Sequence, residues 1–322
     1  MSSKIKWGVL STAKIGVQKV IPAMQQGKYS HIDAIASRSI DKANDAADKL
    51  NIEKRYGSYE DLLNDPGIDA IYNPLPNHLH VPWTIKAMEA GKHVLCEKPV
   101  GMNADEALSL LEAKKNFPRL KVMEAFMYRF HPQWEKAREL VMNGSIGEVK
   151  TLQSFFSYYN IDPENIRNKA GIGGGALMDI GCYCISFPRF IFDEEPVDIV
   201  GYNDIDPVMN IDRLSSGMLR FPSGKTSAFT CSTQLIPYQK VHIFGDQGQI
   251  TIEIPVNAPP EETTTIILRT RDKTRKFSFD PTDQYTLQGD AFSKAVIEDK
   301  PVPTPLEDAV NNMKVLDAIR SA

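Results

Sequence analysis

The chain has 322 residues, of which 42% are hydrophobic and 24% are charged, and its formal net charge is −4. This length predicts about two domains, and the composition is typical of a folded globular protein. The small negative charge argues against partners such as nucleic acid. The sequence has no run of about 18 apolar residues, so we expect no membrane span. The N-terminal segment MSSKIKWGVL lacks a signal-peptide layout, and the four cysteines lack disulfide or zinc spacing. We therefore expect a cytoplasmic protein without a metal site.

The first third of the chain alternates short apolar runs with helical patterns. Strands are expected at residues 5–10, 31–36, 69–73, 93–96 and 120–126, with helices at 15–26 (interrupted at Pro22), 41–50, 78–90 and 104–115. Alternation with short loops predicts a doubly wound parallel sheet. We expect residues 1–127 to form a Rossmann dinucleotide-binding domain.

The pattern changes after residue 127. Strands are expected at 148–159, 197–205, 212–221, 225–235, 240–245, 249–254 and 263–270, with helices at 132–142, 175–192, 285–299 and 306–321. This order predicts an open, mainly antiparallel sheet in a second domain, 128–322, with the last helix able to pack on the first domain. The helices are too few to cover both faces of the sheet, so we expect a homodimer or homotetramer.

The segment HVLCEKPVG places two charges directly after a buried strand. Glu97 and Lys98 follow the apolar run 93–96, and Pro99 stops the strand. Ligands of open α/β sheets bind at the carboxyl ends of the strands, so Lys98 is a candidate for chemistry. A solvated Glu–Lys pair in a loop is the alternative.

Two further strand ends are candidates for cofactor binding. The turn after the first strand, Ser11-Thr12-Ala13-Lys14-Ile15, occupies the place of a glycine-rich dinucleotide motif, although it retains only Gly16 of the glycines. After the second strand come Ser37 and Arg38, with no carboxylate at the ribose position. A guanidinium there can bind a 2′-phosphate, which favours NADP, although an ordinary surface arginine also fits.

The segment GGGALMDIGCY places Asp179 and Tyr183 four residues apart, on one face of a helix. The residues around them are apolar, so we expect both side chains to be at least partly buried. A buried carboxylate and a buried phenol each need a partner. The pair is therefore either catalytic or a structural Tyr–Asp pair.

These motifs together resemble the oxidoreductase family of glucose-fructose oxidoreductase and myo-inositol dehydrogenase (Gfo/Idh/MocA). The shared landmarks are Pro76-Asn77-x-x-His80, AGKH, Glu97-Lys98-Pro99, GGGALMDIGCY and the segment 306–318. The segments WGVLSTAKIG and MEAFMYRFHPQ, together with Tyr183, are most similar to the branch of dihydrodiol dehydrogenase and NADP-dependent D-xylose dehydrogenase. Many relatives carry histidine at the position of Tyr183.

The resemblance implies that the second domain, 128–322, serves substrate binding and oligomerisation, and it assigns roles to the candidate residues. It implies that Lys98 lies beside the nicotinamide and hydrogen-bonds the substrate hydroxyl, that Tyr183 reaches the same hydroxyl, and that Asp179 orients one or both. Either Lys98 or Tyr183 could be the proton acceptor. Weaker candidates for substrate contacts are Tyr128, Arg129 and Arg167. The cofactor-binding set implied is Ser11, Thr12, Ala13, Lys14, Ile15, Ser37, Arg38, Asn73, Pro74, Leu75, Asn77, Glu97 and Lys98.

The expected activity is hydride transfer between NADP, with NAD as an alternative, and a hydroxyl of a sugar or vicinal diol. Two other functions fit the same residues. One is reduction of a dicarbonyl or keto-sugar, and the other is a non-catalytic nucleotide sensor on the same fold. The sensor has no need for Lys98, Asp179 and Tyr183 together. The substrate and the direction of the reaction stay open at this point.

Overall fold

The computed structural model describes residues 4–321, so residues 1–3 of the N-terminal segment considered above lie outside it. The chain forms two compact units. Unit 1 comprises the described residues up to Met127 together with Tyr285–Val310, and unit 2 comprises Tyr128–Gln284 and the described residues from Asn311 onward. We had expected 128–322 to form one domain, whereas 285–310 belong to unit 1.

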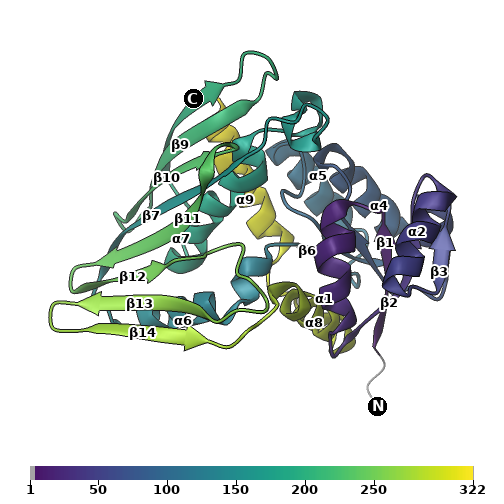
Figure 1. Cartoon of the computed structure of the whole chain (residues 1–322), viewed down its shortest axis with the longest axis horizontal. Coiled ribbons are helices and arrows are strands. Elements are labelled where there is room, and N and C mark those ends of the chain that lie inside the picture. Colours follow the sequence, from purple (N-terminus) through teal and green to yellow (C-terminus); the bar gives the residue numbers. More distant parts are fainter. Residues whose placement is uncertain (1–3, 322) are drawn as a thin grey trace. The chain divides into compact units, whose positions relative to one another are not determined.

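Unit 1 is built on a six-stranded parallel sheet in the order β3-β2-β1-β4-β5-β6 (Figure 1). Its strands are β1 (Ile5–Leu10), β2 (Ser30–Ala36), β3 (Lys54–Tyr56), β4 (Ala70–Asn73), β5 (His93–Cys96) and β6 (Val122–Glu124). Its helices are α1 (Ile21–Gln25), α2 (Ile40–Leu50), α3 (Tyr59–Leu63), α4 (His80–Glu89), α5 (Ala104–Lys114) and α8 (Gln284–Ile297). The central strand β4 is buried throughout, as expected of a sheet covered on both faces. The expected Rossmann fold is confirmed.

The interruption expected at Pro22 is present. A π-helical turn, Gly16–Val20, leads into α1, where the proline occupies the first turn. The helical backbone is continuous from Lys14 through this turn, so Pro22 lies in its interior, where it lacks the amide that would continue the hydrogen-bond ladder. α8 returns to this region, where Trp7 packs against Phe292 and its indole donates to Ser293 Oγ at 3.1 Å.

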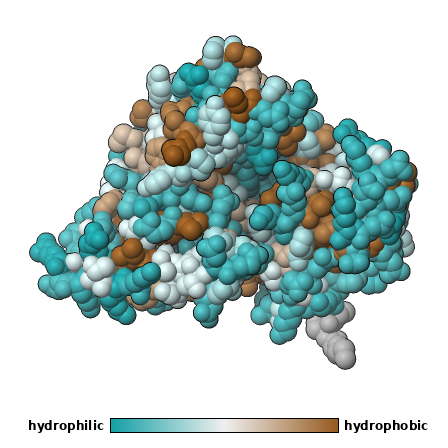
Figure 2. Space-filling model, viewed as in Figure 1, coloured by the Kyte–Doolittle hydropathy of each residue, from teal (hydrophilic) through white to brown (hydrophobic). Residues whose placement is uncertain are grey.

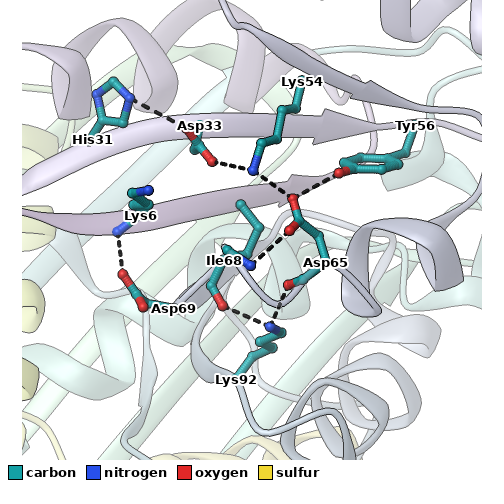
Figure 3. Close-up of polar contacts among 10 residues, drawn as sticks. Lys6, His31, Asp33, Lys54, Tyr56, Asp65, Ile68, Asp69 and Lys92 are labelled. Atoms are coloured by element: carbon teal, nitrogen blue, oxygen red, sulfur yellow. Dashed lines mark hydrogen bonds and ion pairs between the residues drawn. The ribbon is translucent and has the colours of Figure 1, made fainter.

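A polar cluster fixes the segment that leads into β4. Lys54 Nζ lies 3.0 Å from Asp33 and 2.8 Å from Asp65, and the Tyr56 hydroxyl donates to Asp65. The buried Lys92 donates to the carbonyl oxygens of Asp65 and Ile68 at 2.7 and 2.8 Å (Figure 3). Lys92 immediately precedes β5, so its contacts lie at the amino-terminal end of that strand.

Unit 2 contains an eight-stranded sheet in the order β14-β13-β12-β11-β7-β10-β9-β8. Its strands are β7 (Val149–Tyr159), β8 (Asp198–Ile205), β9 (Asp212–Arg220), β10 (Thr226–Ser232), β11 (Gln234–Gly245), β12 (Gly248–Ile252), β13 (Thr264–Thr270) and β14 (Thr274–Phe279). The sheet is antiparallel except where β7 pairs with β10 in parallel, so the mainly antiparallel sheet is confirmed.

One face of this sheet packs on helices α6 (Pro132–Met142), α7 (Cys182–Phe192) and the end of α9 (Leu306–Arg320). The core of this layer includes Trp134 stacked on Phe187, with ring centroids 4.7 Å apart. On the opposite face, which we call the outer face, Val200, Tyr202, Met218 and Tyr238 are all exposed. Hydrophobic patches interrupt the hydrophilic surface of the protein in the region of β9 and β10 (Figure 2).

One helical stretch, Ala170–Phe192, is long and apolar enough for a membrane span, although the sequence analysis expected none. However, 72% of its most apolar window is buried within the protein. This burial is typical of the core helix of a soluble protein, because such a helix satisfies the same length and composition criteria.

Candidate functional site

The turn after β1 has a backbone shape that suits a dinucleotide. Ser11 adopts a φ of 75°, in the left-handed region that glycine usually occupies. Its Oγ accepts the amide of Ala13 at 3.2 Å, and its own amide donates to the carbonyl of Ala36. Serine therefore provides the bend that the missing glycine would provide. A helix begins at Lys14, so its first amides face the turn, where they can bind phosphate.

The third glycine of a dinucleotide-binding motif allows the helix to pack closely on the strand. Gly16 does not have this role. A Cβ atom there would lie 3.6 Å from the Tyr72 ring and 3.7 Å from Pro74, which are ordinary contact distances. The packing of this helix on the sheet therefore does not require a glycine.

The end of β2 presents a basic side chain. Ser37 is buried and its Oγ accepts the amide of Ser39, while Arg38 is exposed. Burial raises the pKa of the Tyr59 phenol, and the positive charge of the nearby Arg38 opposes the rise. The Tyr59 ring in turn packs edge-on against Trp83, with centroids 5.0 Å apart. A rigid aromatic pair therefore backs the guanidinium at the position expected for the adenosine ribose.

Asn73, at the end of β4, is occupied within its own loop. Its buried carboxamide donates to the His80 carbonyl at 3.1 Å and to Thr84 Oγ1 at 3.2 Å, and it accepts the Leu75 amide at 3.3 Å. It therefore shapes the loop that carries the remaining cofactor candidates after β4. These are Pro74 and Leu75, both buried, and the partly exposed Asn77.

Glu97 and Lys98 extend β5 at its carboxyl end, and both are half-buried. The Glu97 amide donates to the Asn73 carbonyl, and its carboxylate accepts the Tyr72 hydroxyl at 2.7 Å. Tyr72 is fully buried, and burial followed by the Glu97 charge raises its pKa. Glu97 is thus anchored to the neighbouring strand, which fixes the backbone from which Lys98 projects.

These segments all belong to unit 1, and each follows the carboxyl end of a strand of the parallel sheet. The chain order reverses between β1 and β4, because β2 and β3 lie on one side and β5 and β6 on the other. A dinucleotide binds at such a reversal in doubly wound folds. The cofactor candidates are therefore gathered where that rule places them.

A second set of candidates lies in unit 2. The Asp179 carboxylate is only 12% exposed, accepts the Tyr158 hydroxyl at 2.6 Å and lies 3.0 Å from Arg167 Nε. The negative charge of Asp179 and the burial of the phenol both raise the pKa of Tyr158, with burial the larger cause. We call Tyr158, Arg167 and Asp179 the carboxylate cluster. Tyr158 was not a candidate in the sequence because β7 and the helix containing Asp179 are distant along the chain.

The glycine run explains how Arg167 reaches Asp179. A Cβ atom on Gly174 would lie 2.6 Å from the Arg167 carbonyl oxygen. One on Gly175 would clash with the Asp212 carboxylate, 1.9 Å from Oδ1. The Gly175 amide donates to the Arg167 carbonyl at 2.8 Å. The absence of side chains therefore lets the loop containing Arg167 lie directly against the start of the helix.

Tyr183 lies one turn beyond Asp179 and is 4% exposed. Its ring packs near Tyr128 and Phe156, with centroids 6.0 and 6.1 Å away. The Arg167 guanidinium is close enough to Tyr183 to interact with it electrostatically.

The weaker candidates Tyr128 and Arg129 have structural contacts. The Tyr128 hydroxyl lies 2.7 Å from Ser186 Oγ, and the Arg129 guanidinium donates to the same oxygen at 2.6 Å. Tyr128 is fully buried, and Arg129 lies over the Phe190 ring. These contacts favour a role in the core of unit 2. Across the described residues 4–321, no group of His, Cys, Asp and Glu side chains has the arrangement of a metal site.

Comparison with known proteins identifies the family. Residues 5–124 match the model of the GFO/IDH/MocA oxidoreductase family with its NAD-binding Rossmann fold, and residues 134–251 match the C-terminal domain of that family. The chain belongs to this oxidoreductase family. The sequence-based expectation of family membership and of an oxidoreductase is thus confirmed.

Several members of the family are similar over nearly the whole chain. D-xylose 1-dehydrogenase (NADP⁺) 2 of Haloferax volcanii is 37% identical, covering 97% of this chain and 95% of the relative. Trans-1,2-dihydrobenzene-1,2-diol dehydrogenase of Xenopus tropicalis is 36% identical, covering 84% and 80%. A 3-ketoreductase from Actinomadura kijaniata, solved with NADP and TDP-benzene, is 28% identical with a TM-score of 0.91, covering 99% and 98%.

Proposed function

We propose that this protein is an NADP-dependent dehydrogenase that oxidises a hydroxyl of a sugar or vicinal diol. The observation that carries the proposal is Lys98, a half-buried lysine held at the carboxyl end of β5 at the edge where a dinucleotide binds. The named activities of the D-xylose and dihydrodiol relatives support the substrate class.

The residues present fit a nicotinamide dinucleotide. The left-handed backbone at Ser11 leaves the following helix amides facing the turn, and Arg38 presents a guanidinium without a competing carboxylate. Arg38 and Ser37 would hold a 2′-phosphate, and Leu75, Asn77 and Glu97 would line the path toward the nicotinamide. When bound, the cofactor would accept the hydride from the substrate carbon.

The proton chemistry belongs to the side chains. Lys98 would hydrogen-bond the reacting hydroxyl, and Tyr183 would accept or return its proton. A free phenol has a pKa of about 10, which is too high for a base at neutral pH. A positive charge beside the hydroxyl, such as the Lys98 ammonium or the Arg167 guanidinium, would lower this value. Asp179 would balance the charge of Arg167. Its contacts with Arg167 and Tyr158 would also fix the orientation of the helix that carries Tyr183.

Reduction of a keto-sugar is the second candidate for the same site. The observation that favours it is the similarity to the 3-ketoreductase, together with 30% identity to the dTDP-3,4-didehydro-2,6-dideoxy-α-D-glucose 3-reductase of Streptomyces violaceoruber. Hydride transfer is reversible, so the same lysine and tyrosine would deliver the proton in that direction. A non-catalytic sensor is less favoured, because it has no use for Lys98, Asp179 and Tyr183 together.

We also propose a homodimer or larger homo-oligomer formed through the outer face, and a cytoplasmic location. The exposed apolar side chains of that face support self-association, because their burial in an interface removes apolar surface from water. The described cysteines are all buried free thiols, which suits a reducing compartment.

A substrate screen tests the proposed activity. Aldoses, polyols and vicinal diols would be incubated with NADP⁺, and dicarbonyls and keto-sugars with NADPH, while the absorbance of the reduced cofactor is followed. We expect turnover with a member of the first group. Cofactor binding without turnover in either set would instead support the sensor.

A further inference from the structure

His80 spans two loops at the edge of the sheet that carries the cofactor candidates. It is the first residue of α4 and is 1% exposed. Its Nδ1 lies 2.7 Å from the carbonyl oxygen of Pro99, and its Nε2 lies 2.6 Å from the carbonyl oxygen of Leu75. One imidazole ring therefore contacts the loop after β4 and the loop after β5.

The regular pairing between β4 and β5 ends where these two loops begin. β4 and β5 are neighbouring parallel strands, paired from Ala70–His93 to Asn73–Cys96. Beyond Cys96 the regular pairing ends, and the Glu97 amide, which donates to the Asn73 carbonyl, extends it by one hydrogen bond. His80 then contacts both loops, at Leu75 and at Pro99, the residue after Lys98. Lys98 thus lies between two ties, the Glu97 amide before it and the Pro99 carbonyl after it.

We propose that His80 is a positioning residue for Lys98, which it holds in place by binding the carbonyl of the next residue, Pro99. This inference rests on the proposed function, because it assigns His80 a part in catalysis through the lysine. A lysine has four rotatable side-chain bonds, so the direction of its ammonium depends on a fixed backbone. Reacting groups misplaced by about 1 Å can lose about a hundredfold in rate.

The surroundings of the ring fit a fixed brace. Asn73 binds the His80 carbonyl and Thr84 Oγ1, so the first turn of α4 is itself tied to β4. Burial lowers the pKa of His80 to about 4; the two carbonyls oppose this effect, while the Lys98 and His78 charges add to it. The ring is therefore neutral at neutral pH and carries one N–H, which we assign to Nδ1, so that it donates to the Pro99 carbonyl and leaves the Leu75 carbonyl beside the unprotonated Nε2. Its neutrality also avoids placing a second positive charge beside Lys98.

The test uses His80→Phe, which keeps a ring of similar size and removes both polar contacts, and His80→Gln, which restores a single donor. We expect kcat for His80→Phe to fall about ten- to a hundredfold, while the Kd for NADP⁺, measured by fluorescence, changes less than about threefold. We expect His80→Gln to recover part of kcat. Because Lys98 is displaced, the pH at which kcat/KM is half-maximal should also move.

Lys92→Met is the matched control for stability. Lys92 is also buried in unit 1 and also binds two backbone carbonyls, but at the amino-terminal end of β5 (Figure 3). We expect it to lower Tm as much as His80→Phe does or more, with kcat per folded molecule and the pH profile unchanged. If both variants lost kcat in proportion to Tm, His80 would be a stabilising residue only, and the proposal would be wrong.

The double variant separates this inference from the proposed function. If His80 acts through Lys98, adding His80→Phe to Lys98→Ala should cost no further rate, because the lysine is already absent. Additive losses would overturn the inference and leave Lys98 as a catalytic residue. Full activity of Lys98→Ala alone would overturn the proposed function itself.

Discussion

The Arg167 guanidinium lies 3.0 Å from the Asp179 carboxylate, and the Tyr158 hydroxyl donates to the same carboxylate oxygen. The loop that carries Arg167 lies against the start of the helix of Asp179, where Gly174 leaves room for its backbone. The carboxylate is therefore oriented before any substrate binds. Its charge is also balanced within unit 2, and does not depend on the lysine for this.

The first prediction concerns this carboxylate cluster. In Arg167→Met, Asp179 loses its cation while it remains buried, so its pKa should rise and the acid limb of the kcat/KM profile should move to higher pH. Tyr158→Phe removes one hydrogen bond and should lower kcat by roughly fivefold, the equivalent of about 1 kcal/mol. Lys169→Met, which removes an exposed lysine of the same loop, is the control and should leave the profile unchanged.

The second prediction tests the proton-transfer residues. Lys98→Ala and Tyr183→Phe should each lower kcat by about 10²–10⁴-fold, the usual contribution of a positioned acid or base. Their affinity for NADP⁺, measured by fluorescence titration, should stay within a few-fold of the parent protein. A Tyr183→Phe variant that turns over at the parent rate would assign proton transfer to Lys98 or water and leave Tyr183 as a packing residue.

The third prediction concerns cofactor preference. Arg38→Ala should raise KM for NADP⁺ by roughly one to two powers of ten, because a hydrogen bond to a charged group contributes about 1.5–3 kcal/mol. The phosphate is remote from the hydride, so kcat should change little. Steady-state kinetics with both cofactors check this. Equal losses with NAD⁺ and NADP⁺ would mean that Arg38 only stacks on the adenine.

Two variants refine that test. Tyr59→Phe removes a hydroxyl near the guanidinium, and we expect a smaller rise in the NADP⁺ KM than for Arg38→Ala. Lys49→Ala, which removes an exposed charge in the last turn of α2, should leave both KM values unchanged.

The fourth prediction is a loss of stability in mild acid that involves His131. This ring is fully buried at the start of α6, where Nδ1 accepts the Gln133 amide, and burial lowers its pKa to about 4. The unfolded imidazole has a pKa of about 6.5, so between these values the unfolded chain binds more protons. The free energy of unfolding should therefore fall as the pH drops from about 6.5 to about 4.

His131→Asn isolates this effect. Asparagine caps a helix well but does not titrate. In this variant, position 131 should therefore add nothing to the pH dependence of the free energy of unfolding. Urea unfolding at several pH values should give a shallower decline than in the parent protein. An identical slope for both proteins would assign the acid sensitivity to other groups, of which His80 is the first to examine.

The fifth prediction concerns self-association. Light scattering at micromolar concentration should give a mass of at least twice the 36.0 kDa of one chain. Met218→Glu, which places a charge among the apolar side chains of the outer face, should shift the protein toward monomer. Met142→Glu alters a methionine at the end of α6 that is even more exposed, and it should not cause this shift. A parent protein that is monomeric would contradict the prediction.

The regular elements were largely predictable because their apolar runs have a clear period. β3 and β14 were missed for a common reason: they are edge strands, and their charged residues, such as Lys54 and Arg275, carry no apolar alternation. α3 is too short for a helical period to be visible. The parallel pairing of β7 with β10 joins segments about 75 residues apart, and no local pattern encodes such a pairing.

The candidate site was predictable in part. Residues directly after strands, such as Lys98 and Arg38, can be placed because the end of a strand fixes their position. The partners Tyr158 and Tyr72 could not, since an isolated tyrosine in a strand gives no sign of which carboxylate it will meet. Asn73 shows the opposite limit, because its position at the end of β4 was correct but its carboxamide is bound within the loop.

The return of residues 285–310 to unit 1 has a consequence for biosynthesis. Ser293 and Phe292 complete the surroundings of Trp7, and the Asp290 carboxylate binds the amides of Lys28 and Tyr29. A ribosome that has synthesised the whole Rossmann sheet has therefore not yet supplied these groups. Unit 2 must be made in between, so the first unit to begin folding can be completed only after the other has left the ribosome. A fragment cut at Met127 would leave the Trp7 indole without its hydrogen-bond acceptor.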